Sequence, residues 1–121
     1  MLLIDAANVV GARPDGWWRD RPGAAQRFVE EVRRAAIAGR LEAPVVVVLE
    51  GAARRGAEPG AVHDVEVVHA PGAGDDTLVA LAAAADGSVL LVSADRQLGA
   101  RCHPAGAKVV GPRWLLDRLA S

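Results

Sequence analysis

Short apolar runs alternate with helical patterns along this chain. Residues 1–5 (MLLID), 44–50 (PVVVVLE) and 88–95 (SVLLVSAD) are rich in aliphatic residues and carry almost no polar residue before their last positions. Runs of this kind predict central parallel strands that are buried on both faces of a sheet. Residues 64–70 (DVEVVHA) alternate in polarity and predict an edge strand, and residues 107–111 (AKVVG) predict a short fifth strand.

Four segments between and after these strands have the spacing of helices. They are residues 22–40, with Pro22 suited to a first turn, residues 74–87, which open with Asp and Thr capping chemistry and end on Gly87, and residues 96–103 and 112–120. This order predicts one domain, residues 1–121, with a doubly wound, mainly parallel five-stranded α/β sheet flanked by helices. Such sheets bind ligands at the carboxyl ends of their strands, beside the point where strand order reverses.

Composition narrows the class of protein. The chain is 51% hydrophobic and 24% charged, and no apolar stretch reaches the roughly 18 residues of a membrane span. A formal net charge of −1 argues against a protein that coats polyanions without specificity. Met1 leads directly into a strand, so we expect no signal peptide and a cytoplasmic location. The single cysteine, Cys102, predicts neither an internal disulfide nor a zinc site.

Acidic residues gather where the predicted strands end. Asp5 ends the first strand, Glu50 ends the second, and Asp95 lies just past the end of the fourth. Because the carboxyl ends of parallel strands share one rim, these carboxylates are expected to meet in one crevice. Negative charges that lie so close to one another repel, and a cation would relieve this repulsion. Mg²⁺ prefers oxygen ligands such as these carboxylates. The pattern therefore predicts metal-assisted attack of water on a phosphodiester.

The helix that leads into the fourth strand opens with two further acids, Asp75 and Asp76. Its amino end reaches the same rim if the preceding loop crosses there. Each acid also has a simpler interpretation as a helix cap, Asn8 as a turn former and Glu50 as the start of a solvated loop.

Three motifs in sequence order resemble the NYN branch of the PIN-like ribonucleases. "LLIDAANVVGA" matches a strand that ends in Asp with Asn three residues later. "GAGDDTLVALA" matches a central helix that opens with Asp after a small residue, and "LLVSAD" matches a strand that ends in Ser, any residue, then Asp. The closing "AKVVGPRWLLDRL" is similar to the last strand and helix of the family. The resemblance covers nearly the whole chain.

The resemblance implies a fold, an activity and a set of site residues. The fold is a PIN-like three-layer sandwich, and the activity is cleavage of RNA in the presence of Mg²⁺ or Mn²⁺, giving a 5′-phosphate. Asp5, Asp75 and Asp95 would be the metal-binding acids, and the neighbouring Asp76 is a further candidate. Asn8 would orient a ligand or water in the same pocket.

Ser93 would hold the loop of Asp95. Arg96 and Gln97 stand where many relatives carry another acid or an amide, which leaves the choice between one metal ion and two open.

Residues 11–23 (GARPDGWWRDRPG) predict a loop that grips RNA. Arg13 and Arg19 are expected to contact phosphates, as is Arg21. One of Trp17 and Trp18 is expected to pack on the core and the other to stack on an unpaired base, a contact worth about 1–3 kcal/mol. The predicted substrate contacts are Arg13, Trp17, Arg19, Ser93 and Arg96. Arg54 and Arg55 fit a solvated loop, with a phosphate contact as the alternative.

Two functions remain open on these residues. The first is the metal-dependent ribonuclease, and the second is an inactive PIN-like module that binds RNA or a protein through the same rim. Carboxylates without a metal ion repel phosphate, which favours the nuclease. A haloacid-dehalogenase-like phosphatase needs a second Asp where Ala7 stands. The sequence is compatible with single-stranded or structured RNA as substrate and with endonucleolytic or exonucleolytic cleavage. It is also compatible with a homodimer and with ribosome association, and no membrane partner is expected.

Overall fold

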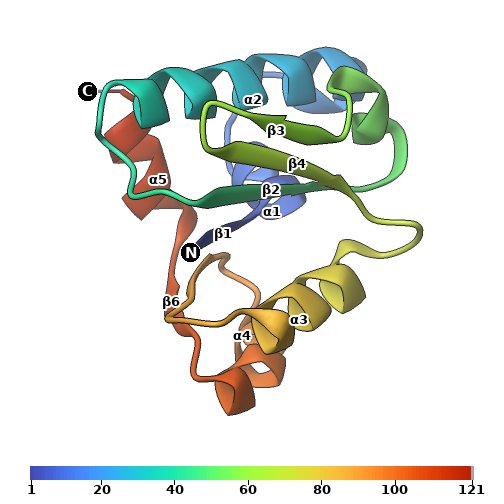
Figure 1. The fold of residues 1–121 in the computed structure, drawn as a ribbon. Helices are drawn as coiled ribbons and strands as arrows, with labels where there is room; N and C mark the ends of the chain where they lie inside the picture. The colour runs from blue at the N-terminus through green and yellow to red at the C-terminus, as the bar shows by residue number, and fades with distance from the viewer. Residues whose placement is uncertain (121) are drawn as a thin grey trace.

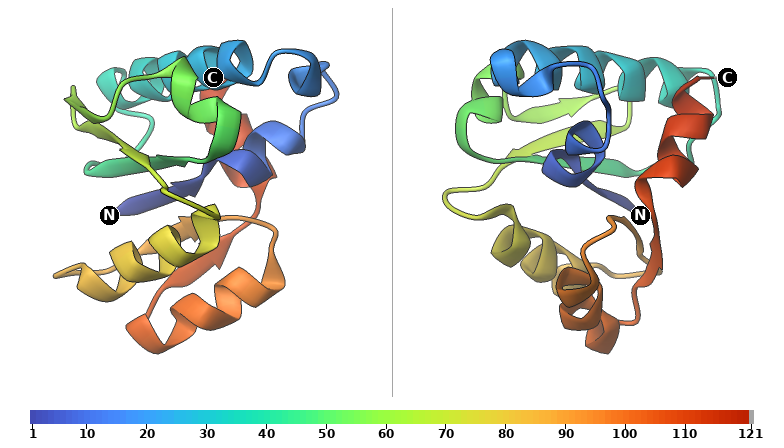
Figure 2. Two further views of the ribbon diagram at one scale, coloured as in Figure 1. Left: turned by 90° about the vertical axis from the view of Figure 1, so that its right-hand side faces the viewer. Right: turned by 180° about the vertical axis from the view of Figure 1, so that it is seen from behind.

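The computed structural model describes residues 1–120 as three layers, with a sheet between two sets of helices (Figures 1 and 2). The six-stranded sheet has the order β3-β4-β2-β1-β5-β6. Its strands are β1 (Leu2–Asp5), β2 (Val45–Leu49), β3 (Gly60–Val62), β4 (Val65–His69), β5 (Leu90–Val92) and β6 (Lys108–Val110). All neighbouring strands run parallel except β3, which pairs antiparallel with β4. The mainly parallel α/β architecture predicted from the sequence is confirmed.

Helices cover both faces of this sheet. The α-helices are α1 (Ala6–Gly11), α2 (Arg21–Ile37), α3 (Gly74–Ala84), α4 (Arg96–Cys102) and α5 (Pro112–Leu119), and the 3₁₀ helices are η1 (Trp17–Arg19), η2 (Gly51–Gly56) and η3 (His103–Ala105). Helices α1, α2 and α5 contact one another on one face, and α3 and α4 lie on the other (Figure 1). No helix within residues 1–120 has the length and apolar character needed to cross a bilayer.

The apolar strands are explained by this double cover. Successive side chains of a strand point to opposite faces, so Ile4 and Val47 join the core under α2 with Phe28. Leu3 joins the second core under α3, where Leu78 is fully buried. Since both faces of the strand are shielded from water, an alternating pattern would place polar groups in a core.

The prediction of five strands with residues 64–70 at the edge is wrong. The sheet has a sixth strand, β3, which forms that edge, and β4 lies inside it. The two strands form a hairpin whose turn residues, His63 and Asp64, both have positive φ, at 49° and 63°. A two-residue turn with both φ positive is usually marked by glycine or asparagine, and this His-Asp pair lacks that signal.

Two local details near the rim also differ from the sequence prediction. No helix is predicted before residue 22, but Val9 and Val10 lie in α1, which starts directly after Asp5. Helix α3 has Ala73 at its N-cap with no side-chain cap, and it ends at Ala84 rather than Gly87. Asp75 and Asp76 lie in the first turn of α3, where carboxylates are favoured by the helix dipole without capping it.

Strand order reverses between β1 and β5. The chain passes from β1 to β2 and β4 on one side, and then returns by α3 to place β5 against the other side of β1. The carboxyl ends of β1 and β5 therefore border the crevice in which sheets of this kind bind ligands. Asp5 is the last residue of β1, and Ser93 directly follows β5.

Candidate active site at the carboxyl ends of the strands

Asp5 occupies the junction between β1 and α1. It is the N-cap of α1, and its Oδ1 accepts a hydrogen bond of 3.4 Å from the backbone N–H of Asn8. The residue is 7% exposed. Burial raises the pKa of the Asp5 carboxyl, the hydrogen bonds from Ser93 and Asn8 oppose this, and the charges of Asp75 and Glu50 raise the pKa further. Asp5 is thus a buried acid within electrostatic reach of two others.

Ser93 connects Asp5 to Asp95. Its hydroxyl donates a hydrogen bond of 2.8 Å to Oδ2 of Asp5 and accepts one of 3.1 Å from the backbone N–H of Asp95. Ser93 is 2% exposed, so its hydroxyl serves these two acids and is not presented to a substrate. The sequence-based assignment of Ser93 as a substrate contact is therefore replaced by a positioning role across the β1–β5 boundary.

The loop after β5 is fixed by two further contacts. Oδ1 of Asn8 accepts a hydrogen bond of 2.8 Å from the backbone N–H of Ala94, which ties α1 to this loop. Asp95 caps α4, because its Oδ1 accepts from the backbone N–H groups of Gln97 at 3.0 Å and Leu98 at 3.1 Å. Arg96 follows at the exposed first position of α4.

Glu50 links the end of β2 to the start of α3. Its Oε2 accepts a hydrogen bond of 2.8 Å from the backbone N–H of Gly74. A Cβ at Gly74 would lie 3.3 Å from Cδ of Glu50, which is a tight contact, so glycine at this position lets the Glu50 side chain approach the backbone without crowding. Asp75 is the next residue, and its pKa is raised by partial burial first and then by the charges of Asp95 and Glu50. Glu50 is thus part of the rim rather than the start of a solvated loop.

Asp75 and Asp76 have separate surroundings. Asp76 forms an ion pair of 2.8 Å with Arg101 of α4, and its side chain is 81% exposed. Asp75 forms no such pair with any residue of 1–120, and the charges of Asp95 and Glu50 act on it more strongly than those of Arg101 and Asp76. The structure therefore brings Asp5, Asp75 and Asp95 to one rim with Asn8 and Glu50, and it directs Asp76 toward α4.

The donor set at this rim suits a hydrated divalent ion. Within residues 1–120, no group of three Asp, Glu, His or Cys residues lies close enough together to enclose a metal ion. Mg²⁺ commonly takes one or two carboxylates and keeps several waters, so it does not need such an enclosure. Burial is the first cause of the raised pKa values of Asp5 and Asp75, and neighbouring carboxylates raise both further, a repulsion that a cation relieves. The residues therefore fit Mg²⁺ or Mn²⁺.

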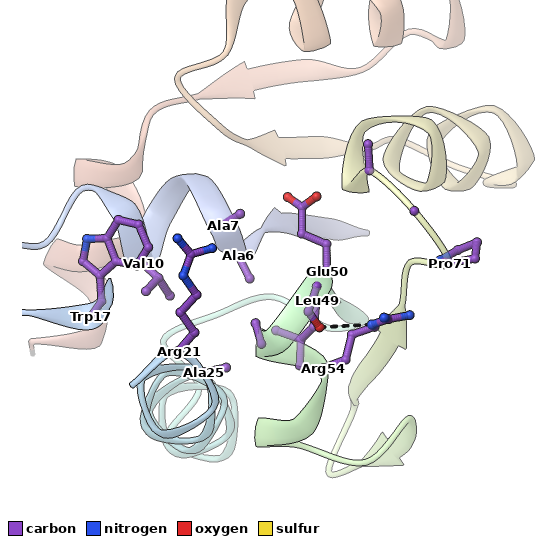
Figure 3. Close-up of a pocket in the computed structure, with 14 residues that line it drawn as sticks. Ala6, Ala7, Val10, Trp17, Arg21, Ala25, Leu49, Glu50, Arg54 and Pro71 are labelled. Carbon is purple, nitrogen blue, oxygen red and sulfur yellow. Dashed lines mark hydrogen bonds between the residues drawn. The ribbon is translucent and has the colours of Figure 1, made fainter. Parts of the chain in front are cut away.

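A pocket of about 500 Å³ adjoins the rim and shares Glu50 with it (Figure 3). Figure 3 shows Trp17 and Arg21 on one side and Arg54 on the other. The guanidinium of Arg21 lies 5.3 Å from the ring centroid of Trp17. Arg54 donates hydrogen bonds to the backbone carbonyls of Gly51 at 3.1 Å and Ala70 at 3.3 Å, which fix its side chain.

The sequence-predicted RNA contacts are only partly collected at this pocket. Arg13 forms a two-bond pair with Glu31 at 2.7 and 2.8 Å, which gives its guanidinium a structural partner. Trp18 is 55% exposed, and Arg19 lies over its ring at 5.7 Å, outside the pocket lining.

The sequence did not predict that Arg54 and Glu50 line the same pocket as Trp17. Both follow directly or closely on the end of β2, and the strand-end rule that selected Glu50 is the one signal that points to this place.

Comparison with known proteins supports the fold. No protein-family model and no curated protein sequence matches this chain. Among solved structures, the chain is similar to the W164L mutant of Rae1 (YacP) from Bacillus subtilis, with a TM-score of 0.68 and 22% sequence identity. The match covers 98% of this chain and 73% of the Rae1 chain. Likeness at this level of identity shows that the two chains share the three-layer α/β fold.

Proposed function

We propose that this protein is a divalent-metal-dependent ribonuclease of the NYN branch of the PIN-like superfamily. The observation that supports this most is the Asp5–Ser93–Asp95 linkage at the point where strand order reverses. A buried hydroxyl that binds one acid and fixes the backbone of another is an arrangement that positions carboxylates. Asp75 approaches the same rim from α3, and its pKa is raised in part by Asp95.

Asp5, Asp75 and Asp95 are the residues that would hold Mg²⁺ or Mn²⁺, directly or through water. When bound, such an ion polarises a phosphate oxygen and lowers the pKa of a coordinated water. Ser93 holds the Asp5 carboxylate through a hydrogen bond, and Asn8 fixes the loop that carries Asp95. These hydrogen bonds orient the acids before substrate arrives, so less ordering remains to be done in the reaction.

Glu50 is the better placed of two candidate proton acceptors. Asp76 is committed to Arg101 and is 81% exposed. Glu50 borders the pocket, acts electrostatically on both Asp5 and Asp75, and has one carboxylate oxygen, Oε1, beyond the oxygen that binds Gly74. We assign Glu50 to accept the proton released by the attacking water.

RNA is the proposed substrate, single-stranded or with unpaired segments. Arg19 and Arg96 are exposed near the rim-bearing elements and are proposed to contact phosphates, which position a strand without reading its sequence. A cytoplasmic location, a homodimer and ribosome association stay predictions.

The chemistry of the product ends tests this mechanism. Purified protein is incubated with an end-labelled RNA in Mn²⁺, in Mg²⁺ and in chelator, and the product termini are identified. Attack by water predicts 5′-phosphate and 3′-hydroxyl ends that form only with the metal ion. A 2′,3′-cyclic phosphate would show attack by the ribose hydroxyl and contradict the mechanism. RNA binding without cleavage in either metal ion would instead support an inactive binding module.

A further inference from the structure

The pocket beside the acidic rim shares Glu50 with the proposed hydrolysis, and its other lining residues have no role in that step. We propose that it receives one unpaired base of the RNA, so that the adjoining phosphodiester lies over the rim acids. This inference rests on the proposed function and adds the element that places the substrate. The pocket and the acids share Glu50 as a common wall, which makes the two sites neighbours on one strand of RNA.

The size and floor of the pocket suit a flat heterocycle. Its volume is about 500 Å³, within the range of roughly 300–1,000 Å³ that is usual for small-molecule sites. The floor is apolar and is formed by Ala6, Val10, Ala25, Leu49 and Ala53. Small side chains dominate this floor, which leaves room for a ring. Burying the apolar faces of a base against this floor is favourable, whereas its apolar side chains cannot bind a phosphate by themselves.

One wall is a stacking surface. The Arg21 guanidinium lies over the Trp17 ring, and Arg21 forms no ion pair with an acid of residues 1–120. Trp17 is half-buried, and a Cβ at Gly11 would meet its Cζ2 at 3.8 Å, so the indole lies against the end of α1. Guanidinium planes and aromatic rings are the two surfaces on which proteins stack unpaired bases.

The charges around the pocket suit the phosphate that a base carries with it. Arg21 and Arg54 contribute two positive charges against the single negative charge of Glu50. Arg54 is held by two backbone carbonyls and keeps its charge at the opposite wall. A nucleotide bound here has its base on the apolar floor and its phosphate attracted by the guanidiniums, next to acids that by themselves would repel it.

Base pairing excludes a nucleotide from this pocket. A base stacked and paired within a duplex has no free face, and extruding it costs a few kcal/mol. The pocket therefore selects RNA that is single-stranded at one position beside the cleaved bond. The proposal does not require the pocket to distinguish the four bases.

An abasic scan in chelator tests the proposal without cleavage. Affinity is measured by fluorescence anisotropy for a short single-stranded RNA and for copies that each lack one base. We expect one abasic position to weaken binding by roughly 5- to 100-fold, the size of one stacking contact. Ala7→Leu, which fills the pocket from the exposed side of α1, should abolish this penalty, as should Trp17→Leu combined with Arg21→Gln.

Matched controls lie beside the pocket. Trp18→Leu and Arg19→Gln alter an exposed ring and cation that do not line it, so the abasic penalty should persist even if overall affinity falls. A scan in which no position matters, or a penalty that survives Ala7→Leu, overturns the proposal. Metal-dependent cleavage without an abasic penalty would leave the nuclease assignment standing and remove the base pocket. An abasic penalty without cleavage in any metal ion would support the base pocket and remove the nuclease assignment.

Discussion

The Ser93 hydroxyl lies between two acids. It donates a hydrogen bond of 2.8 Å to Oδ2 of Asp5 and accepts one of 3.1 Å from the backbone N–H of Asp95. These contacts join the ends of β1 and β5 across the point where strand order reverses. The positions of both acids thus depend on one buried side chain, which has consequences for stability and for activity.

Ser93→Ala should lower both stability and cleavage. The variant leaves Oδ2 of Asp5 and the N–H of Asp95 without their buried partner, which typically costs about 1–3 kcal/mol of unfolding free energy. Loss of the hydrogen bond that lowers the pKa of Asp5 should also shift the pH–rate profile toward higher pH. Urea unfolding and cleavage at several pH values measure these effects. Ser88→Ala, at an exposed position, is the control. Equal pH profiles for wild type and Ser93→Ala would argue against the positioning role.

Stability should depend on pH through the rim acids. The pKa values of Asp5 and Asp75 are both raised, so the folded state binds their protons more tightly than the unfolded state does. Their stabilising contribution is full below the ordinary value of 3.8 and is lost as pH rises through the higher folded pKa values.

Asp75→Asn removes one of these acids, so it should be more stable than wild type at neutral pH, with a difference that shrinks in acid. Denaturant unfolding across this range, with Asp86→Asn as an exposed control, measures it. A stability difference that does not shift in this direction between neutral pH and acid would contradict the raised pKa of Asp75.

Arg13 should affect stability and not RNA binding. Its two hydrogen bonds to Glu31 join the loop after α1 to α2, and the Arg13 side chain is 24% exposed. A pair at this depth is partly screened by solvent, so Arg13→Gln should cost about 0.5–1 kcal/mol. The pKa of Glu31 is lowered by Arg13, so this contribution is present above the ordinary carboxyl pKa and disappears as pH falls through the lowered one. Thermal unfolding and RNA anisotropy separate the two effects. A large loss of RNA affinity would restore Arg13 as a substrate contact.

Metal ions should stabilise the protein through Asp5. A ligand that binds only the folded state at 100 times its Kd adds about 2.7 kcal/mol, so Mn²⁺ should raise the Tm of wild type. Asp5→Asn should lose this response. Asp76→Asn should keep it, because Asp76 pairs with Arg101 and is 81% exposed. The Tm is followed during titration with Mn²⁺, with Ca²⁺ in parallel to detect unspecific charge screening. An unchanged response in Asp5→Asn would place the ion elsewhere.

The architecture and the rim acids were predictable from the sequence, whereas details set by local backbone geometry were not. Continuous apolar runs identify strands covered on both faces, and their carboxyl ends identify Asp5 and Asp95. Strand β3 was missed because its three residues are all exposed and its turn uses His63 and Asp64 at positive φ. Helix α1 was missed because its six residues are too few to show helical periodicity.

The site required long-range information for its remaining parts. Glu50 and Gly74 are 24 positions apart, and their contact depends on how the chain leaves β4. The separation of Asp75 from Asp76 depends on Arg101, which comes from another helix. The pocket joins η1, α2 and η2, and no periodicity in the sequence reports that these three segments meet.

Cleavage of a labelled single-stranded RNA by wild type and Asp5→Asn, side by side in Mn²⁺, tests the central claim most directly. Asn is nearly isosteric with Asp and can keep one of the two hydrogen bonds that Asp5 accepts, so circular dichroism and thermal unfolding first establish that the variant is folded. The account predicts cleavage by wild type that chelator abolishes, cleavage by Asp76→Asn, and none by folded Asp5→Asn. Undiminished cleavage by Asp5→Asn, or cleavage in chelator, would contradict it.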